Sequence, residues 1–155
     1  MDKLDIHQLL SEHFMLSEFI RSHTADNLHI NNTPDEGVIE NLRKLCTCIL
    51  EPTRIMLKES IIVTSGYRCK LLNKRIGGVG KSQHLSGKAA DLHIRSKEYA
   101  VKLWQILMTN NHVDQLLWEH DHRGSEWIHV SYSDHPRHFI DQNFKANAAI
   151  NKTLD

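Results

Sequence analysis

Two histidines and one aspartate have the residue types and spacing of ligands for a divalent metal ion. His84 and Asp91 lie seven positions apart, with Gly87 between them. His129 follows further along the chain. Neutral imidazole and carboxylate groups both bind zinc, and three protein ligands leave a fourth position for water. The sequence therefore predicts a hydrolytic zinc site at His84, Asp91 and His129.

A carboxylate close to the third of these residues is a candidate general base. Glu126 precedes His129 by three positions. A glutamate that is not a metal ligand can accept a proton from the attacking water, so we predict this role for Glu126. Residues three apart in a regular strand point to opposite faces. The prediction therefore requires Glu126 to lie at the start of its strand.

These residues belong to two motifs that resemble those of a known enzyme family. Residues 82–91 read Ser-x-His-x-x-Gly-x-Ala-x-Asp, and residues 126–129 read Glu-x-x-His. Both motifs resemble those of the zinc D-Ala-D-Ala peptidases, the M15 peptidases. Residues 65–68, Ser-Gly-Tyr-Arg, also resemble a segment of that family. The similarity extends from about Phe14 to about Tyr132 and looks closest to a small, single-domain branch found in bacteria and their phages.

The resemblance implies zinc-dependent hydrolysis of a peptide bond in the stem peptides of bacterial peptidoglycan. It implies zinc ligation by His84, Asp91 and His129, and proton transfer by Glu126. It also implies that Arg68 contacts the reacting substrate, where its planar guanidinium suits either an oxyanion or a carboxylate. Further candidates for contacts to substrate or to the ligands are Ser82, Tyr67 and His93.

Two bonds of the stem peptide are possible substrates by this resemblance. One is the terminal D-Ala-D-Ala bond, cut by carboxypeptidases, and the other is the L-Ala-D-Glu bond, cut by phage endolysins. Residues 1–7 are polar and acidic and do not resemble a signal peptide. We therefore expect a cytoplasmic protein that reaches the wall through a separate phage holin pore, which favours the endopeptidase. Three loop cations flank the motifs and are candidates for a second substrate contact: Lys81, Lys88 and Arg123.

Two functions without catalysis are alternatives. The signalling domain of hedgehog proteins resembles this fold, keeps a zinc site and acts by protein contact. A phage structural protein with vestigial chemistry is the second alternative. The presence of both Glu126 and Arg68 favours an enzyme, because a purely structural zinc site requires neither. Residues 119–122 also resemble a metal-binding cluster, but we interpret them as a hairpin turn leading to Gly124.

Composition limits the class of protein. A chain of 155 residues is expected to form one domain, with its core at about residues 14–132. Lysine plus arginine and aspartate plus glutamate balance at 19 each, so no basic surface indicates nucleic-acid binding. No apolar run approaches the roughly 20 residues that span a membrane. Three cysteines without Cys-x-x-Cys spacing do not indicate a disulfide framework. We expect a monomer.

The elements that must position the site indicate an α+β fold of the hedgehog and D,D-peptidase type. A short amphipathic segment at 3–13 precedes a long helix that opens at Asp35 and bends at Pro52. A small antiparallel sheet is expected from residues 61–64, 90–94, 115–119 and 127–132, with zinc on its open face. The helix at 96–108 packs on the sheet through Val101, Leu103, Trp104 and Leu107. A loop at 76–81 borders the cleft, and residues from about 140 to 155 form a polar tail.

Overall fold

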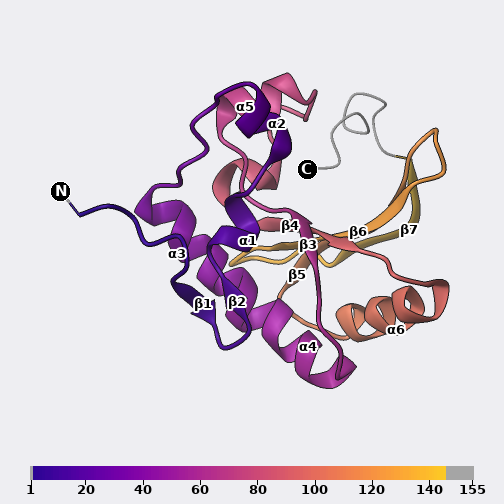
Figure 1. Cartoon of the computed structure of the whole chain (residues 1–155). Helices are drawn as coiled ribbons and strands as arrows, with labels where there is room; N and C mark the ends of the chain where they lie inside the picture. The colour runs from indigo at the N-terminus through magenta and orange to yellow at the C-terminus, as the bar shows by residue number, and fades with distance from the viewer. Residues whose placement is uncertain (1, 146–155) are drawn as a thin grey trace.

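The structure is a computed structural model that describes residues 2–145. A five-stranded sheet lies at its centre with helices packed beside it, which confirms the α+β class (Figure 1). The strands are arranged in the order β3-β4-β6-β5-β7. Their bounds are Val63–Ser65 for β3, Ala89–His93 for β4, Glu126–Tyr132 for β6, Val113–His120 for β5 and Phe139–Lys145 for β7.

The fifth strand corrects the prediction for the C-terminal part of the chain. The four expected strands pair antiparallel, but β7 runs parallel to β5 along one edge, so the sheet is mixed. Residues 140–145, which we assigned to a polar tail, therefore belong to a strand. Apolar and polar residues do not alternate regularly in this segment, so its pattern does not indicate a strand. The rest of the predicted tail, residues 146–155, lies outside the described residues.

The N-terminal segment folds as a small hairpin rather than as an amphipathic lead-in. Strands β1 (Leu9–Ser11) and β2 (Phe14–Met15) pair antiparallel, and the short helices α1 (Ser17–Ile20) and α2 (His23–Asn27) follow. Glu51 of the helical layer is hydrogen-bonded to the hairpin. Its Oε1 accepts hydrogen bonds from the Ser11 hydroxyl at 2.8 Å and from the His13 amide at 2.7 Å.

The long helical segment begins where the sequence predicts. The Asp35 carboxylate accepts a hydrogen bond from the Val38 amide at 2.8 Å, which caps α3 (Glu36–Leu45). A π-helical segment, η1 (Cys46–Leu50), then leads into α4 (Glu51–Leu57). Pro52 lies in the first turn of α4, where a missing N–H group is tolerated. The helical layer thus continues past the proline.

The two faces of the sheet have different roles. Ala90 and Leu92 of β4, together with Ile128 and Val130 of β6, are fully buried in the main hydrophobic core. Helix α6 (Lys97–Met108) contributes Leu103, Trp104 and Leu107 to that core, as predicted. Val101 is 37% exposed, contrary to prediction, because it lies beside the apolar stripe that Tyr99 and Ala100 complete. Side chains alternate along a strand, so the intervening residues of β4 and β6 face away from the core.

Two smaller elements complete the part of the chain that surrounds the open face. Helix α5 (Lys70–Arg75) follows β3, and a short 3₁₀ turn, η2 (Gln83–Ser86), precedes β4. None of the helices in residues 2–145 has the length and apolar character to cross a membrane. Cys46, Cys48 and Cys69 are all free thiols, as the sequence indicates.

Candidate active site

The turn η2 fixes the first candidate ligand, His84. The Ser82 hydroxyl accepts a hydrogen bond from the His84 amide at 3.2 Å and caps the turn. Gly87 ends the turn in the left-handed conformation, with φ of 73°. A Cβ atom there would lie 2.8 Å from the carbonyl oxygen of Val38 in α3. The glycine therefore allows η2 to pack directly on α3 and lead into β4.

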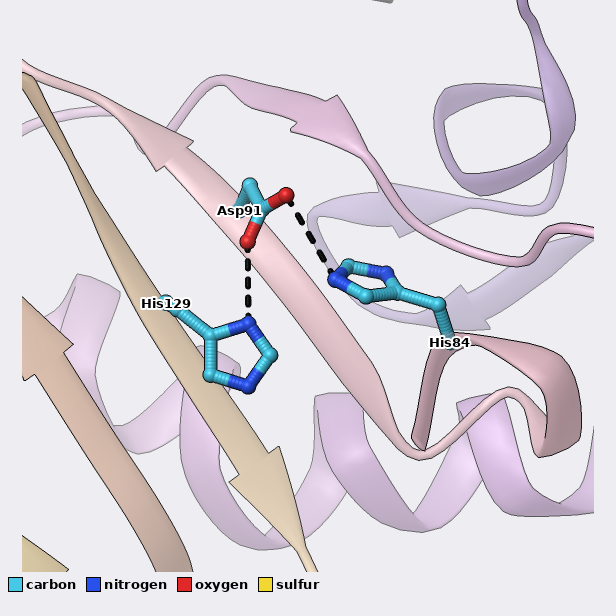
Figure 2. A group of neighbouring side chains, drawn as sticks. All are labelled: His84, Asp91 and His129. Atoms are coloured by element: carbon cyan, nitrogen blue, oxygen red, sulfur yellow. Dashed lines mark hydrogen bonds and ion pairs between the residues drawn. The ribbon is translucent and has the colours of Figure 1, made fainter. Parts of the chain in front are cut away.

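The strand register brings the other two candidate ligands to the same place. Asp91 of β4 lies opposite His129 of β6, and paired residues of an antiparallel sheet share a face. Asp91 lies between the two histidines (Figure 2). Its Oδ1 is 3.0 Å from His129 Nδ1, and its Oδ2 is 3.4 Å from His84 Nε2. The sequence-predicted trio thus comes together, with one ligand atom from each residue within 4.8 Å of the others.

A second contact orients the His84 ring. Its Nδ1 lies 2.6 Å from the carbonyl oxygen of Gly66, which can only accept, so Nδ1 carries the proton. Nε2 therefore presents a lone pair toward Asp91. Burial, together with the nearby positive charge of Arg68, lowers the pKa of His84 to about 4. The imidazole is consequently neutral, which is the form that binds a metal ion.

Asp91 and His129 shift each other's pKa in opposite directions in the metal-free protein. Burial alone would raise the pKa of Asp91, but the two histidines outweigh it and hold that pKa far below its usual range. Burial alone would lower the pKa of His129, but the hydrogen bond and charge of Asp91 raise it. Because a metal ion binds neutral imidazole, a metal ion and a proton compete for His129.

The donor set fits zinc. Two imidazole nitrogens and one carboxylate are an established combination for this ion, and they leave further coordination positions open. All three side chains are buried, and the protein fixes two of them through hydrogen bonds to Gly66 and Asp91. Among residues 2–145, this is the group of histidine, cysteine and acidic side chains with metal-binding geometry.

Glu119 is a functional candidate that the sequence analysis missed. It lies two residues after Leu117, which pairs with His129, so it points to the same face. Its Oε1 is 3.7 Å from His129 Nδ1, and the residue is 6% exposed. Burial, and then repulsion by Asp91, raises the pKa of Glu119 to about 7. This carboxyl group can therefore both accept and release a proton near neutral pH.

Glu126 does not share this environment. It opens β6, is exposed and pairs with His120. Because β6 is regular from its first residue, Glu126 points to the face opposite His129. The placement does not support the base role that we predicted for it. The expected strand at 115–119 already includes Glu119, and alternation along it places Glu119 on the same face as Leu117.

A cavity of about 300 Å³ adjoins the three candidate ligands and Glu119. One part of its wall is apolar, made by Val79, Leu117, Phe139 and Phe144. The polar part includes Arg68, Gln83, Gln115 and Arg137. The volume is at the lower end of the range for ligand sites, which suits a short peptide segment.

The family comparison agrees with this geometry. The sequence model of the Peptidase M15 family matches residues 12–131. The chain belongs to the M15 peptidase family. A search of curated protein sequences found no match. The matched region contains all three candidate ligands and Glu119, so the buried site is that of an M15 metallopeptidase.

Arg68 lies inside the site of this M15 peptidase. It is 4% exposed, and its Nη2 is 3.7 Å from Asp91 Oδ2. Its Nη1 donates to Asn73 Oδ1 at 3.3 Å, and its backbone amide donates to the carbonyl of His84. The residue lines the cavity, in agreement with the placement that the sequence indicates. Its contact with substrate remains a prediction.

The remaining predicted residues divide into two groups. Ser82 and Lys81 line the cavity. Tyr67 instead packs against the hydrophobic core, and His93 is exposed at the end of β4. Lys88 and Arg123 are also absent from the cavity wall. The expected loop at 76–81 does border the cavity, through Gly78, Val79 and Lys81.

Proposed function

We propose that this M15 metallopeptidase hydrolyses a peptide bond in the stem peptides of bacterial peptidoglycan, with zinc as its metal. The observation that carries the proposal is the position of Glu119. A buried carboxyl group that titrates near neutral pH lies next to the His84, Asp91 and His129 group, inside a cavity. A purely structural zinc site has no use for such a group.

His84, Asp91 and His129 would hold the metal ion. When bound, zinc supplies a Lewis acid that lowers the pKa of a water ligand toward about 7 and polarises a carbonyl group. Asp91 lies between the two histidines and fixes their relative orientation. The hydrogen bond from His84 Nδ1 to Gly66 holds that ring in place.

Glu119 performs the proton transfers in this proposal. Its carboxylate accepts a proton from the attacking water and then donates it to the nitrogen of the leaving amine. The raised pKa of about 7 suits both steps, because neither protonation state is strongly disfavoured at neutral pH.

Arg68 stabilises negative charge that develops on the carbonyl oxygen. Its guanidinium lines the cavity and is held by Asp91 and Asn73, so it need not reorganise during the reaction. A bound metal ion would partly neutralise Asp91, which leaves the charge of Arg68 available to the substrate.

Two bonds of the stem peptide are candidates for cleavage. The first is L-Ala-D-Glu, as for a phage endopeptidase, and the second is D-Ala-D-Ala, as for a carboxypeptidase. The cavity of about 300 Å³ suits the few residues that flank either bond. The identity of the products decides between them.

Digestion of purified peptidoglycan tests the proposal. The zinc-loaded parent protein, Glu119→Gln and Glu126→Gln are compared by mass spectrometry of the released peptides. We expect new amino-terminal D-Glu or free D-alanine from the parent, a rate lower by about 10²- to 10⁴-fold for Glu119→Gln, and near-parental activity for Glu126→Gln. Release of neither product with zinc bound would favour the alternative of a hedgehog-like binding module. A larger loss in Glu126→Gln would restore that residue as the base.

A further inference from the structure

A second polar network adjoins the cavity, apart from the candidate metal ligands. Asp114 of β5 is 2% exposed and accepts hydrogen bonds from two other parts of the chain. The Arg137 amide and Nε donate to its Oδ1 at 2.8 and 3.0 Å, and Arg137 Nη2 donates to Oδ2 at 2.7 Å. Gln83 Nε2 donates to the same Oδ2 at 2.9 Å. The network therefore joins β5, the segment before β7, and the residue next to His84.

The network holds the Arg137 guanidinium in a fixed position on the cavity wall. Asp114 engages Nε and Nη2, which form one edge of the guanidinium. Nη1, on another edge, makes no hydrogen bond to any residue in the range 2–145. The Arg137 side chain is 61% exposed, yet the residue lines the cavity. The guanidinium is thus anchored on one side and can bind an anion on the other.

Charges inside the cavity determine where an anionic group of a substrate can lie. Asp91 and Glu119 are buried at the end that contains the candidate ligands. Arg68 is also at that end and is engaged by Asp91 and Asn73. Arg137 instead lies on the exposed side of the same cavity. Arg137 therefore offers a substrate carboxylate a guanidinium edge that no residue in the range 2–145 engages.

We propose that Arg137 binds a free carboxylate of the peptide substrate, and that Asp114 and Gln83 are positioning residues that hold its guanidinium. The inference rests on the proposed function and specifies the substrate as a peptide with a carboxylate close to the cleaved bond. Both candidate bonds meet this requirement. The terminal D-alanine carries a free carboxylate, and D-Glu does so because the stem continues through its side-chain carboxyl group.

Binding measurements without turnover test the assignment. The zinc-loaded Glu119→Gln protein is titrated with the pentapeptide L-Ala-γ-D-Glu-L-Lys-D-Ala-D-Ala and with two analogues, each amidated at one free carboxylate. The same titrations are made with double variants that combine Glu119→Gln with a second substitution: Arg137→Gln, Arg137→Lys, Asp114→Asn or Arg123→Gln. Arg123 is an exposed arginine away from the cavity wall, so it is the matched control.

We expect amidation of one carboxylate to weaken binding by about 10- to 100-fold, the scale of a charge-assisted hydrogen bond. Arg137→Gln should weaken binding of the unmodified pentapeptide by a similar factor. It should not weaken binding of the analogue whose amidation already reduced the affinity. Asp114→Asn should reduce the difference in affinity between the unmodified pentapeptide and that analogue. Arg137→Lys should retain part of this difference, and Arg123→Gln should leave it unchanged. Discrimination that persists in Arg137→Gln, or no binding of the pentapeptide, would overturn the inference. Carboxylate-dependent binding without cleavage of peptidoglycan by the parent would support the inference while contradicting the proposed function.

Discussion

Burial places Glu119 in a different protonation state from an ordinary surface glutamate. Burial first, and then the charge of Asp91, raises its pKa from 4.5 to about 7. The folded, metal-free protein therefore binds a proton at Glu119 more tightly than the unfolded chain does. The stability that this proton contributes is complete below pH 4.5 and is lost as the pH rises through about 7.

This linkage predicts the behaviour of a neutral replacement. In metal-free protein, Glu119→Gln should gain stability relative to the parent as the pH rises from 5 to 8, by about 1–3 kcal/mol. Urea unfolding in the presence of a chelator at both pH values measures the difference. Glu126→Gln is the control, because Glu126 is exposed and on the other face. An equal pH-dependent gain in both variants would show that Glu119 is not the titrating group.

The sequence predicts the group of His84, Asp91 and His129 that the structure brings together, but it does not single out Glu119. The motifs contain His84, Asp91 and His129, and the register of β4 and β6 brings Asp91 and His129 together. Glu119 and Glu126 point to opposite faces of the sheet, and Glu119 is buried whereas Glu126 is exposed. Alternation along the expected strand at 115–119 places Glu119 with Leu117, but the sequence does not show that Leu117 pairs with His129.

At the scale of elements, the turn η2 determines where His84 lies. It passes so close to α3 that only a glycine fits at residue 87, where φ is 73°. A methyl group there would meet Val38 Cγ1 and the Val38 carbonyl oxygen, both at 2.8 Å. Relief of those contacts requires η2 or α3 to shift, and a shift of η2 displaces His84.

Gly87→Ala should therefore lower both stability and zinc affinity. The left-handed conformation and the contacts together should cost about 1–3 kcal/mol, measured by chemical unfolding, and zinc affinity should fall in competition with a chromophoric chelator. Gly80→Ala is the matched control, because a Cβ atom there has no neighbour within 4 Å. Parental zinc affinity in a folded Gly87→Ala protein would show that η2 adjusts without moving His84.

The elements that the sequence did not predict are those that depend on tertiary contacts. The hairpin β1–β2 is only a few residues long, and Glu51 fastens it from 40 residues away. Strand β7 lies at the edge of the sheet, where it pairs with β5 alone. In both cases the local pattern is too short or too polar to indicate a strand. The central strands were predictable because they are rich in apolar residues, most of which are buried.

At the scale of the whole molecule, a metal ion at this site would link three elements of the chain. The three candidate ligands come from η2, β4 and β6, and span residues 84–129 (Figure 2). In the metal-free protein, the contacts among them are hydrogen bonds and ion pairs around Asp91. The unfolded chain has no comparable arrangement, so zinc binds the native state preferentially.

Zinc should therefore stabilise the entire domain. At free zinc 100-fold above its dissociation constant, the gain is about 2.7 kcal/mol, which corresponds to roughly 5–10 °C in Tm for a domain of this size. Calorimetric unfolding with zinc and with a chelator measures it. His129→Ala should lose the increase in Tm together with the bound metal. His93→Ala should retain both, because His93 shares β4 with Asp91 but is exposed and outside the cavity wall. Full retention of zinc and of the Tm increase in His129→Ala would remove His129 from the metal site, and loss of both in His93→Ala would place that residue in it.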